Sequence, residues 1–543
     1  MSKLSAPRRF RRPLIAALFG SLALLACRNT NLPPEVPGQP SVRLYIVSTL
    51  AGAMEPCGCR KDMLGGIDHA AALLATDAAN APRRLLLGAG PLFFQEPELA
   101  PERREQDLWK AEALAASLAD VKLAAWAPGA NDFAAGAEAL SRLTQKSGAK
   151  LLGTNLGTDP AATQIASTAV FDVGGYKVGV AGIGAGPDGA PAADAARALS
   201  EAEQALRDAG AQIRVALIAA KRGDGLRLAE KVPGFTLVAL GKPTESGDAN
   251  DGAFPPALVG ETLVVQAPNH LQAFAYVDLF VRSGDFSFED GVGIALAEQR
   301  DSLRGRVSEL EARRQRAVDA KASAEQIAAI EHELARAHTE QAELDRRAAA
   351  PSTVKGSTFR YEEAFVREDR GSDAAVAQRM SDYYRRVNDH NRVALANRQP
   401  PPPPFGELGY SGGQACIFCH READTYWRTT QHAHAYETLS REFKEYNLDC
   451  VSCHVTGYER PGGSTVTHVE RLKNVQCESC HGAGEGHAKS GGDTKLITRT
   501  PSERVCKSCH HTPHVADDWN IAASWLKIVG KGHGEGSQYP GGK

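Results

Sequence analysis

The sequence Cys416-Ile-Phe-Cys419-His420 is the first of four pentapeptides with the pattern Cys-x-x-Cys-His. The other three are Cys450-Val-Ser-Cys453-His454, Cys477-Glu-Ser-Cys480-His481 and Cys506-Lys-Ser-Cys509-His510. A spacing of three residues places both sulfurs on one side of a helical turn, where they can form thioethers to the two vinyl groups of one porphyrin. The next histidine can then bind the iron. The pattern predicts four covalently attached c-type haems, with the four motif histidines as proximal ligands.

Zinc sites and redox-active Cys-x-x-Cys turns are the alternatives, because they use the same cysteine spacing. Neither requires a histidine after the second cysteine, and only 16 of the 543 residues are histidine. Histidine after all four pairs has a chance probability of roughly one in a million. The motifs therefore favour haem.

The residues available in this segment limit which side chains can be the sixth ligand of each iron. The methionines, Met1, Met54, Met63 and Met380, all lie outside the segment that carries the motifs. The distal ligands are therefore expected to be histidines, which favours low reduction potentials. This segment contains seven further histidines: His432, His434, His468, His487, His511, His514 and His533.

Residues 410–534 resemble the tetrahaem cytochrome c-554 family of multihaem c-type cytochromes. Three patterns carry the resemblance: Trp427-x-x-Thr430-x-His432, Val475-x-Cys477-Glu478-x-Cys480-His481-Gly482-x-Gly484-x-x-His487 and Ile528-x-x-x-x-His533-Gly534. By position, it implies His432, His487 and His533 as distal ligands of haem iron. In that family the second haem is five-coordinate, which corresponds here to the motif of His454. His468 and His514 remain alternative ligands for that iron.

The first 27 residues have the pattern of an export signal. A basic head with Arg8, Arg9, Arg11 and Arg12 precedes an apolar run, 14–26, that is too short to span a bilayer. The run ends in Leu24-Leu25-Ala26-Cys27, which resembles a bacterial lipobox, where the cysteine is acylated. Residues 28–40 are polar and proline-rich, as expected for a tether. We expect a lipoprotein of the bacterial cell envelope, periplasmic or outer-membrane-associated; an ordinary cleaved signal or a short anchor is the alternative.

Residues 41–290 alternate short β-branched runs with amphipathic segments, which predicts a layered α/β domain. Strands are expected at 42–47, 84–87, 170–173, 177–180, 215–219 and 236–240. Helices are expected at 70–79, 108–118 and 199–209.

The order of these segments resembles the 5'-nucleotidase branch of the metallophosphoesterases. Leu85-Leu86-Leu87-Gly88-Ala89-Gly90-Pro91 and Gly129-Ala130-Asn131-Asp132-Phe133 carry the match. Other side chains stand at the positions of the family's metal ligands: Thr49, Ala51, Pro91, Ala130, Asn131, Ala220 or Lys221, Lys242 and Thr244. They lack the carboxylate and imidazole donors of a two-metal centre that generates hydroxide. The resemblance therefore implies a degenerate domain with an inactive hydrolase site.

The loop after the first expected strand contains Cys57 and Cys59, in the sequence Glu55-Pro56-Cys57-Gly58-Cys59-Arg60. These cysteines are candidates for a reactive thiol pair, a strained disulfide or half of a soft-metal site. A structural turn is an equally good interpretation.

The rest of the chain divides by composition. Residues 291–350 are rich in Ala, Glu, Arg and Gln, with apolar residues at spacings of three and four, which predicts a helical hairpin with a coiled-coil-like seam. A single long helix is the alternative. Residues 351–399 are expected to be a helical connector, and 400–404 a polyproline linker. Residues 405–543 have little periodicity, so we expect a mainly α domain whose core is supplied by porphyrins.

These features favour one function over two others. The net charge of −3, with 23% charged residues, gives no sign of a nucleic-acid partner. We expect electron transfer in the cell envelope, with redox proteins as partners and with a membrane contact through the lipid anchor. A haem-dependent oxidoreductase that reduces small nitrogen compounds at an open haem is the alternative. A phosphoesterase or nucleotidase is disfavoured.

Overall fold

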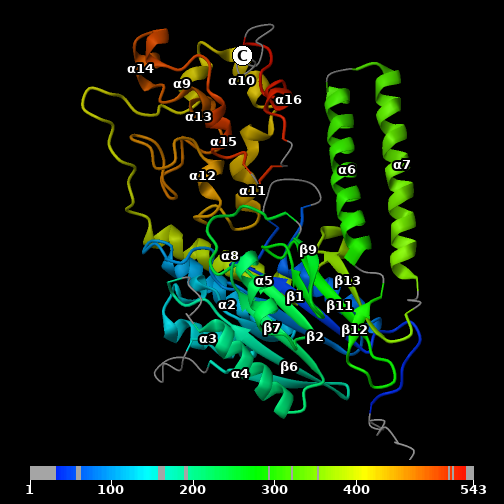
Figure 1. Ribbon diagram of the computed structural model, residues 1–543. Coiled ribbons are helices and arrows are strands. Elements are labelled where there is room, and N and C mark those ends of the chain that lie inside the picture. Colours follow the sequence, from blue (N-terminus) through cyan, green and yellow to red (C-terminus); the bar gives the residue numbers. More distant parts are fainter. Residues whose placement is uncertain are drawn as a thin grey trace, which may run out of the picture.

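The computed structural model describes residues 32–56, 63–156, 165–188, 194–252, 254–291, 294–319, 322–350, 354–511, 514–515 and 519–533. They form an α/β sandwich, a helical hairpin that projects from it and a C-terminal domain of short helices that lies over one end of the sandwich (Figure 1). The predicted export signal with Cys27, and the Cys57–Cys59 pair, lie outside the described residues. Within those residues, none of the helices combines the length and apolar character needed to cross a lipid bilayer.

The first sheet of the sandwich has seven strands in the described residues, in the order β12-β13-β11-β1-β2-β3-β4. Strands β1, β2, β3 and β4 run parallel, whereas β11 is antiparallel to both β1 and β13. Their bounds are β1 (Val42–Ser48), β2 (Arg84–Ala89), β3 (Leu123–Ala127), β4 (Lys150–Leu151), β11 (Ala273–Phe280), β12 (Phe288–Asp290) and β13 (Ser357–Phe365).

The second sheet has six strands among the described segments, in the order β5-β6-β7-β8-β10-β9. Its central strands are parallel and its two edge strands are antiparallel to their neighbours. The bounds are β5 (Thr168–Val173), β6 (Tyr176–Ile183), β7 (Ile213–Ala219), β8 (Leu237–Gly241), β9 (Phe254–Val259) and β10 (Thr262–Gln266).

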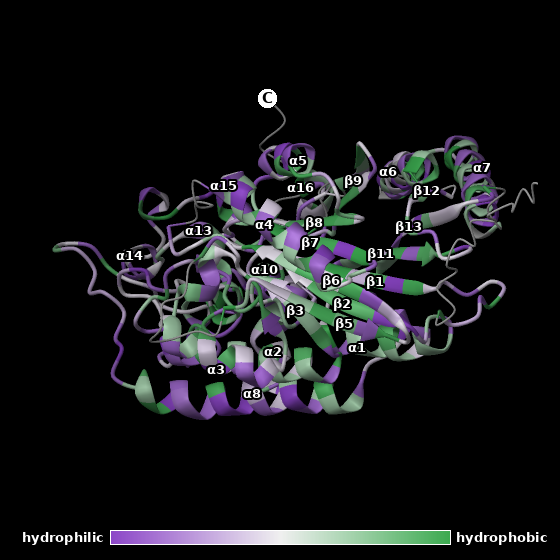
Figure 2. Cartoon of the chain, turned by 60° about the horizontal axis from the view of Figure 1, so that its bottom comes forward, coloured by the Kyte–Doolittle hydropathy of each residue, from purple (hydrophilic) through white to green (hydrophobic). Residues whose placement is uncertain are grey.

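The two sheets face each other and helices cover their outer faces, which gives four layers. Strand β1 is buried on both sides, because Leu44 and Ile46 point between the sheets while Tyr45 and Val47 point toward the helices. In Figure 2 the strands are predominantly apolar, whereas the covering helix α8 carries many polar residues. The helices over the first sheet are α1 (Ile67–Thr76), α2 (Arg104–Asp120), α3 (Ala137–Ser147) and α8 (Ala374–Ala394); those over the second are α4 (Ala195–Asp208) and α5 (Arg222–Lys231).

The layered α/β fold predicted from the sequence is confirmed. Each of the six expected strands and three expected helices overlaps an observed one. Strand β3 escaped prediction because its sequence, Leu-Ala-Ala-Trp-Ala, is alanine-rich and has no β-branched residue.

Two antiparallel helices, α6 (Ile294–Asp319) and α7 (Ala324–Ala349), form the projecting hairpin. The hydroxyl of Ser323 accepts a hydrogen bond from the backbone N–H of Gln326 and so caps the start of α7. The chain turns back here, as expected for a hairpin and not for a single long helix. Its seam consists of Leu296, Leu303, Leu310, Ile330, Leu334, Ala337 and Leu344.

Residues 351–399 differ from the helical connector expected from the sequence. Strand β13 lies in this segment and pairs with β11 and β12, so it belongs to the first sheet. Phe359 and Tyr361 alternate with polar residues and are buried between the two sheets. Helix α8 then packs on the same sheet's helical layer. The hairpin is therefore an insertion between two strands of the α/β domain, which continues beyond residue 290.

The C-terminal domain contains only short helices among the described residues, as expected. Its apolar cluster is small and consists of Tyr436, Val451, Val455, Val466 and Val469. The helices are α9 (Gln414–Ile417), α10 (Arg421–Trp427), α11 (Ala435–Arg441), α12 (Val451–His454), α13 (Cys477–His481), α14 (Glu485–Lys489), α15 (Glu503–Lys507) and α16 (Ile521–Trp525).

Candidate functional site

Each Cys-x-x-Cys-His motif lies on a helical turn. The backbone N–H of His420 donates to the carbonyl of Cys416 at 2.9 Å, and that of His510 donates to Cys506 at 2.9 Å. The second motif ends helix α12, and the third motif forms the whole of α13. None of the eight motif cysteines forms a disulfide, so each sulfur is available for attachment. The turn brings the two sulfurs of a motif to one side, as thioether attachment requires.

The four motifs contact one another. Cys416 lies close to Cys477, which brings the first motif to the third. Cys453 lies close to Cys509, which brings the second to the fourth. Cys480 and Cys506 lie close enough to interact electrostatically. The attachment cysteines therefore form one continuous group.

The side chain of Glu478, inside the third motif, connects the first motif to the third. Its carboxylate is 1% exposed and accepts backbone N–H bonds from Ser411 at 2.8 Å, Gly412 at 2.7 Å and Gly484 at 2.7 Å. Ser411 and Gly412 precede the first motif. One buried carboxylate thus fixes the first motif against the third, and three donors compensate its loss of water.

Histidines implied as distal ligands lie beside proximal ones. The ring centroids of His420 and His487 are 6.3 Å apart with an interplanar angle of 30°. Those of His432 and His510 are 6.0 Å apart at 45°. His533 lies near His481 and, with a weaker electrostatic effect, near His420. Rings that are far apart in the sequence therefore face each other in pairs.

These separations fit a metal-centred porphyrin held between two imidazoles. A metal–imidazole bond is about 2 Å long and the ring centroid lies about 1 Å beyond the nitrogen, so two rings on opposite sides of one iron have centroids about 6 Å apart. The two measured pairs have this spacing. The residues present fit the group that the sequence implies.

Backbone carbonyls orient several of these rings. The Nδ1 atom of His454 lies 2.6 Å from the carbonyl of Ala435, and that of His481 lies 2.7 Å from Thr498. The Nδ1 atom of His487 lies 2.9 Å from the carbonyl of Asp493. A carbonyl oxygen only accepts, so Nδ1 carries the proton in each ring. Nε2 is left with its lone pair, which is the tautomer that binds a metal.

Burial keeps three rings neutral. It lowers the pKa of His432, His510 and His533, with neighbouring histidines lowering each pKa further. The His510 ring also stacks on Trp519, with centroids 4.9 Å apart at 20°. A neutral imidazole is the form that a metal requires.

The remaining histidines of the domain lie elsewhere. His434 is exposed and its Nε2 lies 3.2 Å from the carbonyl of Arg428. His468 lies 2.8 Å from the side-chain nitrogen of Gln399, in the segment before the linker. His511 and His514 lie beside Asp248 of the α/β domain. His468 and His514, the alternative ligands for the second haem, therefore each contact residues outside the haem motifs.

The cysteine geometry disfavours zinc and redox-active turns. In a redox Cys-x-x-Cys turn the reactive contact is within one motif, whereas Cys453 lies close to Cys509 of another motif. Burial raises the pKa of Cys480 to about 11, so this thiol is protonated. Over the described segments, none of the eight cysteines belongs to a cluster of three or more metal-ligating atoms.

The segment before the second motif docks on the α/β domain. Asp449 forms ion pairs with Arg103 and with Lys110, whose Nζ lies 3.4 Å from the carboxylate. Desolvation alone would raise the pKa of Asp449, but Lys110 and Arg103 lower it to about 2. Lys444 pairs with Glu55 at 2.8 Å, in the loop that leads to Cys57. Sequence reasoning missed this interface because no local pattern connects residue 103 to residue 449.

The positions that resemble the hydrolase site lie together at one edge of the sandwich. The hydroxyl of Thr49 accepts the backbone N–H of Lys242 at 2.8 Å, and that of Thr244 donates to the side chain of Asn131 at 3.1 Å. The Lys242 ammonium lies 2.8 Å from Glu245 and 2.9 Å from Asp251. A fixed side-chain cation and its carboxylates therefore occupy the edge where the family has metal ligands.

The C-terminal region is similar to known cytochromes. Residues 415–482 match the family described as cytochrome c554 and c-prime, which covers the first three motifs. Cytochrome c-554 from Nitrosomonas europaea is 31% identical over 134 residues. The match covers 19% of this chain and 57% of that protein, so this chain spans little more than half of its relative's length. The C-terminal region is cytochrome c-554-like, as expected from its sequence.

Two phosphoesterase structures are among the solved structures to which the chain has a partial likeness. A 5'-nucleotidase precursor from Thermus thermophilus has a TM-score of 0.43 at 16% identity, covering 66% of this chain and 61% of that one. A calcineurin-like phosphoesterase from Bacillus subtilis has a TM-score of 0.37 at 16% identity, covering 45% and 86%.

Proposed function

We propose that this chain is a multihaem c-type cytochrome lipoprotein that transfers electrons in the bacterial cell envelope. The observation that carries the proposal is the set of four Cys-x-x-Cys-His turns, in two of which the motif histidine has a second histidine ring 6.0 or 6.3 Å away. The cytochrome c-554-like sequence of the same region supports it.

The residues that would hold the four haems follow from this arrangement. The eight motif cysteines would form the thioethers and the four motif histidines would bind the irons. His487 beside His420, His432 beside His510 and His533 near His481 would supply the distal ligands. Haem iron supplies reversible one-electron chemistry, and ligation by two histidines favours low potentials.

An electron relay requires attachment sites held next to one another. Cys416 lies close to Cys477, and Cys453 lies close to Cys509, which brings the motifs together in pairs. Cys480 lies near Cys506, which connects the two pairs. Glu478 fixes the spacing of the first and third motifs. The chain therefore arranges its attachment sites as a contiguous series.

In this proposal the α/β domain is a scaffold or a docking surface for a redox partner. Its hydrolase-like edge holds the Lys242 ammonium between Glu245 and Asp251. The Lys242 ammonium would repel a divalent ion placed there, and it already pairs with both carboxylates. Assays with nucleotide and phosphate-ester substrates, with Mn²⁺ or Zn²⁺ added, are expected to show no turnover; robust hydrolysis would contradict the proposal.

Potentiometric titration of the purified, exported protein tests the function. We expect several c-haem transitions at low potential, with low-spin signals from the haems that have a distal histidine. His487→Gln is expected to convert one haem to high spin, because the side chain that replaces the ligand is a poor donor for haem iron. His434→Gln, at an exposed histidine, is the matched control and is expected to leave the spectrum unchanged. Exported protein without redox-active covalent haem would refute the proposal.

The same samples test the alternative, a haem enzyme that reduces small nitrogen compounds. It requires an open coordination position, which the family resemblance implies for the haem of His454. A high-spin signal that shifts on addition of nitrite, nitric oxide or hydroxylamine, with turnover, would favour the enzyme. Uniformly low-spin spectra would exclude it.

A further inference from the structure

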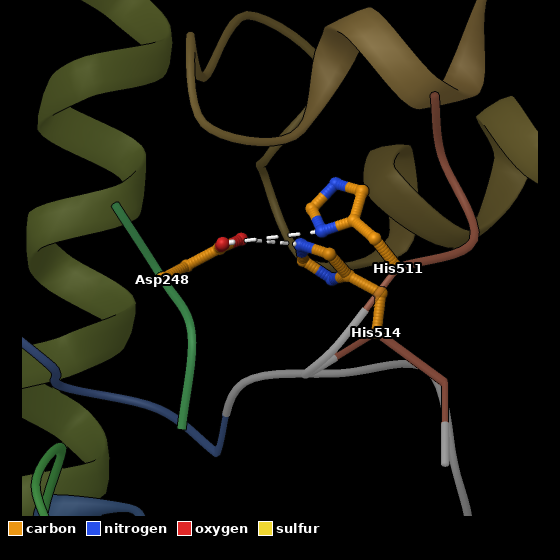
Figure 3. Close-up of side chains that lie close together, drawn as sticks. All are labelled: Asp248, His511 and His514. Atoms are coloured by element: carbon orange, nitrogen blue, oxygen red, sulfur yellow. Dashed lines mark hydrogen bonds and ion pairs between the residues drawn. The ribbon is translucent and has the colours of Figure 1, made fainter. Parts of the chain in front are cut away.

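A cluster of three side chains at the boundary between the two domains is used neither by the haem motifs nor by the cores. Asp248 follows strand β8 in the α/β domain, while His511 and His514 follow the fourth motif. Their ligand atoms all lie within 4.8 Å of one another. Figure 3 shows the two imidazoles turned toward the Asp248 carboxylate from the facing chain segment.

Only one of the two imidazoles in the cluster lies within hydrogen-bond distance of the Asp248 carboxylate. Nε2 of His514 lies 2.8 Å from one carboxylate oxygen of Asp248. Nδ1 of His511 lies 4.0 Å from the other oxygen, which is beyond hydrogen-bond range. The two rings are perpendicular, at 87°, with centroids 5.0 Å apart. Two imidazole nitrogens and one carboxylate thus lie close enough together to reach one ion.

Two imidazole nitrogens and one carboxylate oxygen are a donor set for a divalent transition metal. Zn²⁺ takes histidine and carboxylate ligands at about 2 Å, commonly three from the protein with water in the fourth position. Alkaline-earth ions prefer oxygen donors throughout. Hydrogen bonding to His514 lowers the pKa of Asp248, so the carboxylate is ionised.

We propose that Asp248, His511 and His514 bind one divalent transition-metal ion of the Zn²⁺ type, which joins the α/β domain to the haem domain. The site goes beyond electron transfer and uses none of the axial ligands. It is open to solvent, because the side chains of Asp248 and His514 are each 31% exposed and that of His511 is 44% exposed. An ion can therefore enter the folded protein.

A metal at this position would stabilise the contact between the domains. Asp248 and His514 are separated by 266 positions in sequence, so the unfolded chain does not present them together. An ion that binds only the docked state shifts the equilibrium toward it. The Asp449 ion pairs provide a second contact between the haem domain and the α/β domain.

Zinc binding to the full-length, haem-loaded protein tests the proposal. Protein stripped with a chelator is equilibrated with Zn²⁺, and bound zinc is counted against protein by elemental analysis and amino-acid analysis. The count is independent of haem content, so it does not depend on the proposed function. We expect one zinc per chain in the wild type and at least tenfold weaker binding in Asp248→Asn and His514→Gln.

Two controls separate this site from surface binding. Asp369→Asn and His434→Gln change an exposed carboxylate and an exposed histidine far from the cluster in sequence, and are expected to bind zinc as the wild type does. Equal zinc binding by all five proteins, or no bound zinc in the wild type, would overturn the proposal.

Zinc K-edge absorption of the wild type alone gives a second test that does not depend on the folding of variants. The expected first shell contains two imidazoles and oxygen ligands. Sulfur ligation, or a shell of oxygen atoms only, would contradict the site.

Discussion

The α/β domain and the C-terminal domain of this chain are held together in different ways. The α/β domain has three apolar clusters, one between its sheets and one under each helical layer, and every residue of strand β1 is buried. The C-terminal domain has a single cluster of five buried residues within its described part. Its other links are polar, such as the three backbone bonds to Glu478 and the carbonyl bonds of its histidines.

The difference indicates what each domain needs in order to fold. Burial of apolar surface is the main source of stability, so the α/β domain can fold from its own side chains. A domain of more than 100 residues with so few buried aliphatic side chains lacks that source. In our account, covalently attached porphyrins supply the missing apolar surface and the histidine–iron bonds supply the cross-links. Four changes, from the largest expected effect to the smallest, test this contrast.

The largest effect is expected from omitting haem attachment altogether. Without the signal sequence and the maturation machinery, the α/β domain should fold while residues 405–543 remain unfolded. Protease cleavage in that region should be faster by about two orders of magnitude, because an unfolded segment is permanently accessible. Limited proteolysis with mass spectrometry measures this, and haem-loaded protein from the same gene is the control. If the haem-free C-terminal domain resisted protease, the proposed difference between the two domains would be wrong.

Trp126→Ala should instead weaken the α/β domain selectively. The Trp126 side chain is fully buried and packs edge to face on Phe93, with centroids 5.6 Å apart. Removing a large buried aromatic side chain costs about 3–5 kcal/mol. Denaturation followed by far-UV circular dichroism should show the loss, while haem spectra at low denaturant stay unchanged. Val393→Ala, at an exposed position of α8, should cost less than about 0.5 kcal/mol. A similar loss in both variants would contradict the assignment of this core.

Glu478→Gln should destabilise the haem domain alone. The amide keeps one acceptor but turns an NH₂ group toward backbone donors, which should cost about 2–3 kcal/mol. The unfolding midpoint followed by haem absorbance reports the change. Glu437→Gln, whose side chain is 61% exposed, is the matched control. An unchanged midpoint in Glu478→Gln would show that the contacts between the first and third motifs are dispensable.

Asp449→Asn should have the smallest effect, because it weakens only the contact between the domains. The partly exposed ion pairs with Arg103 and Lys110 should contribute about 1–2 kcal/mol after screening by solvent. The folded-state pKa of Asp449, about 2, lies below its ordinary value of 3.8, so this stability is present above about pH 4 and is lost as the pH falls toward 2.

Stability measured against pH checks both the size and the sign of this effect. The difference between wild type and Asp449→Asn should be constant near neutral pH and should vanish toward pH 2. Asp389→Asn, at a side chain that is 79% exposed, should show no difference at any pH. A difference that grows on acidification would contradict the ion-pair assignment.

The sequence predicts well what depends on local pattern. Apolar, β-branched runs such as those of β1 and β7 mark buried strands, and the Cys-x-x-Cys-His turns mark attachment sites directly. Strand β13 was hidden because its alternation is short: Glu363 stands where an apolar residue should follow Phe359 and Tyr361. Its pairing with β11 depends on contacts across an inserted hairpin, which no local window contains.

Prediction of the functional site is limited in the same way, because a local sequence pattern does not reveal contacts between distant residues. The motif spacing predicts which cysteines and histidines act together within a turn, but not that the ring of His487 faces His420. Glu478 and Asp449 gain their roles from partners more than 60 residues away in sequence. Asp248 has no sequence motif of its own, and only the docking of two domains brings it to His511 and His514.

Intact-mass and peptide mass spectrometry of the mature, exported protein tests the central claim most directly. The account predicts four haems per chain, each linked through both cysteines of one Cys-x-x-Cys-His turn. Eight unmodified cysteine thiols in a folded C-terminal domain would contradict it.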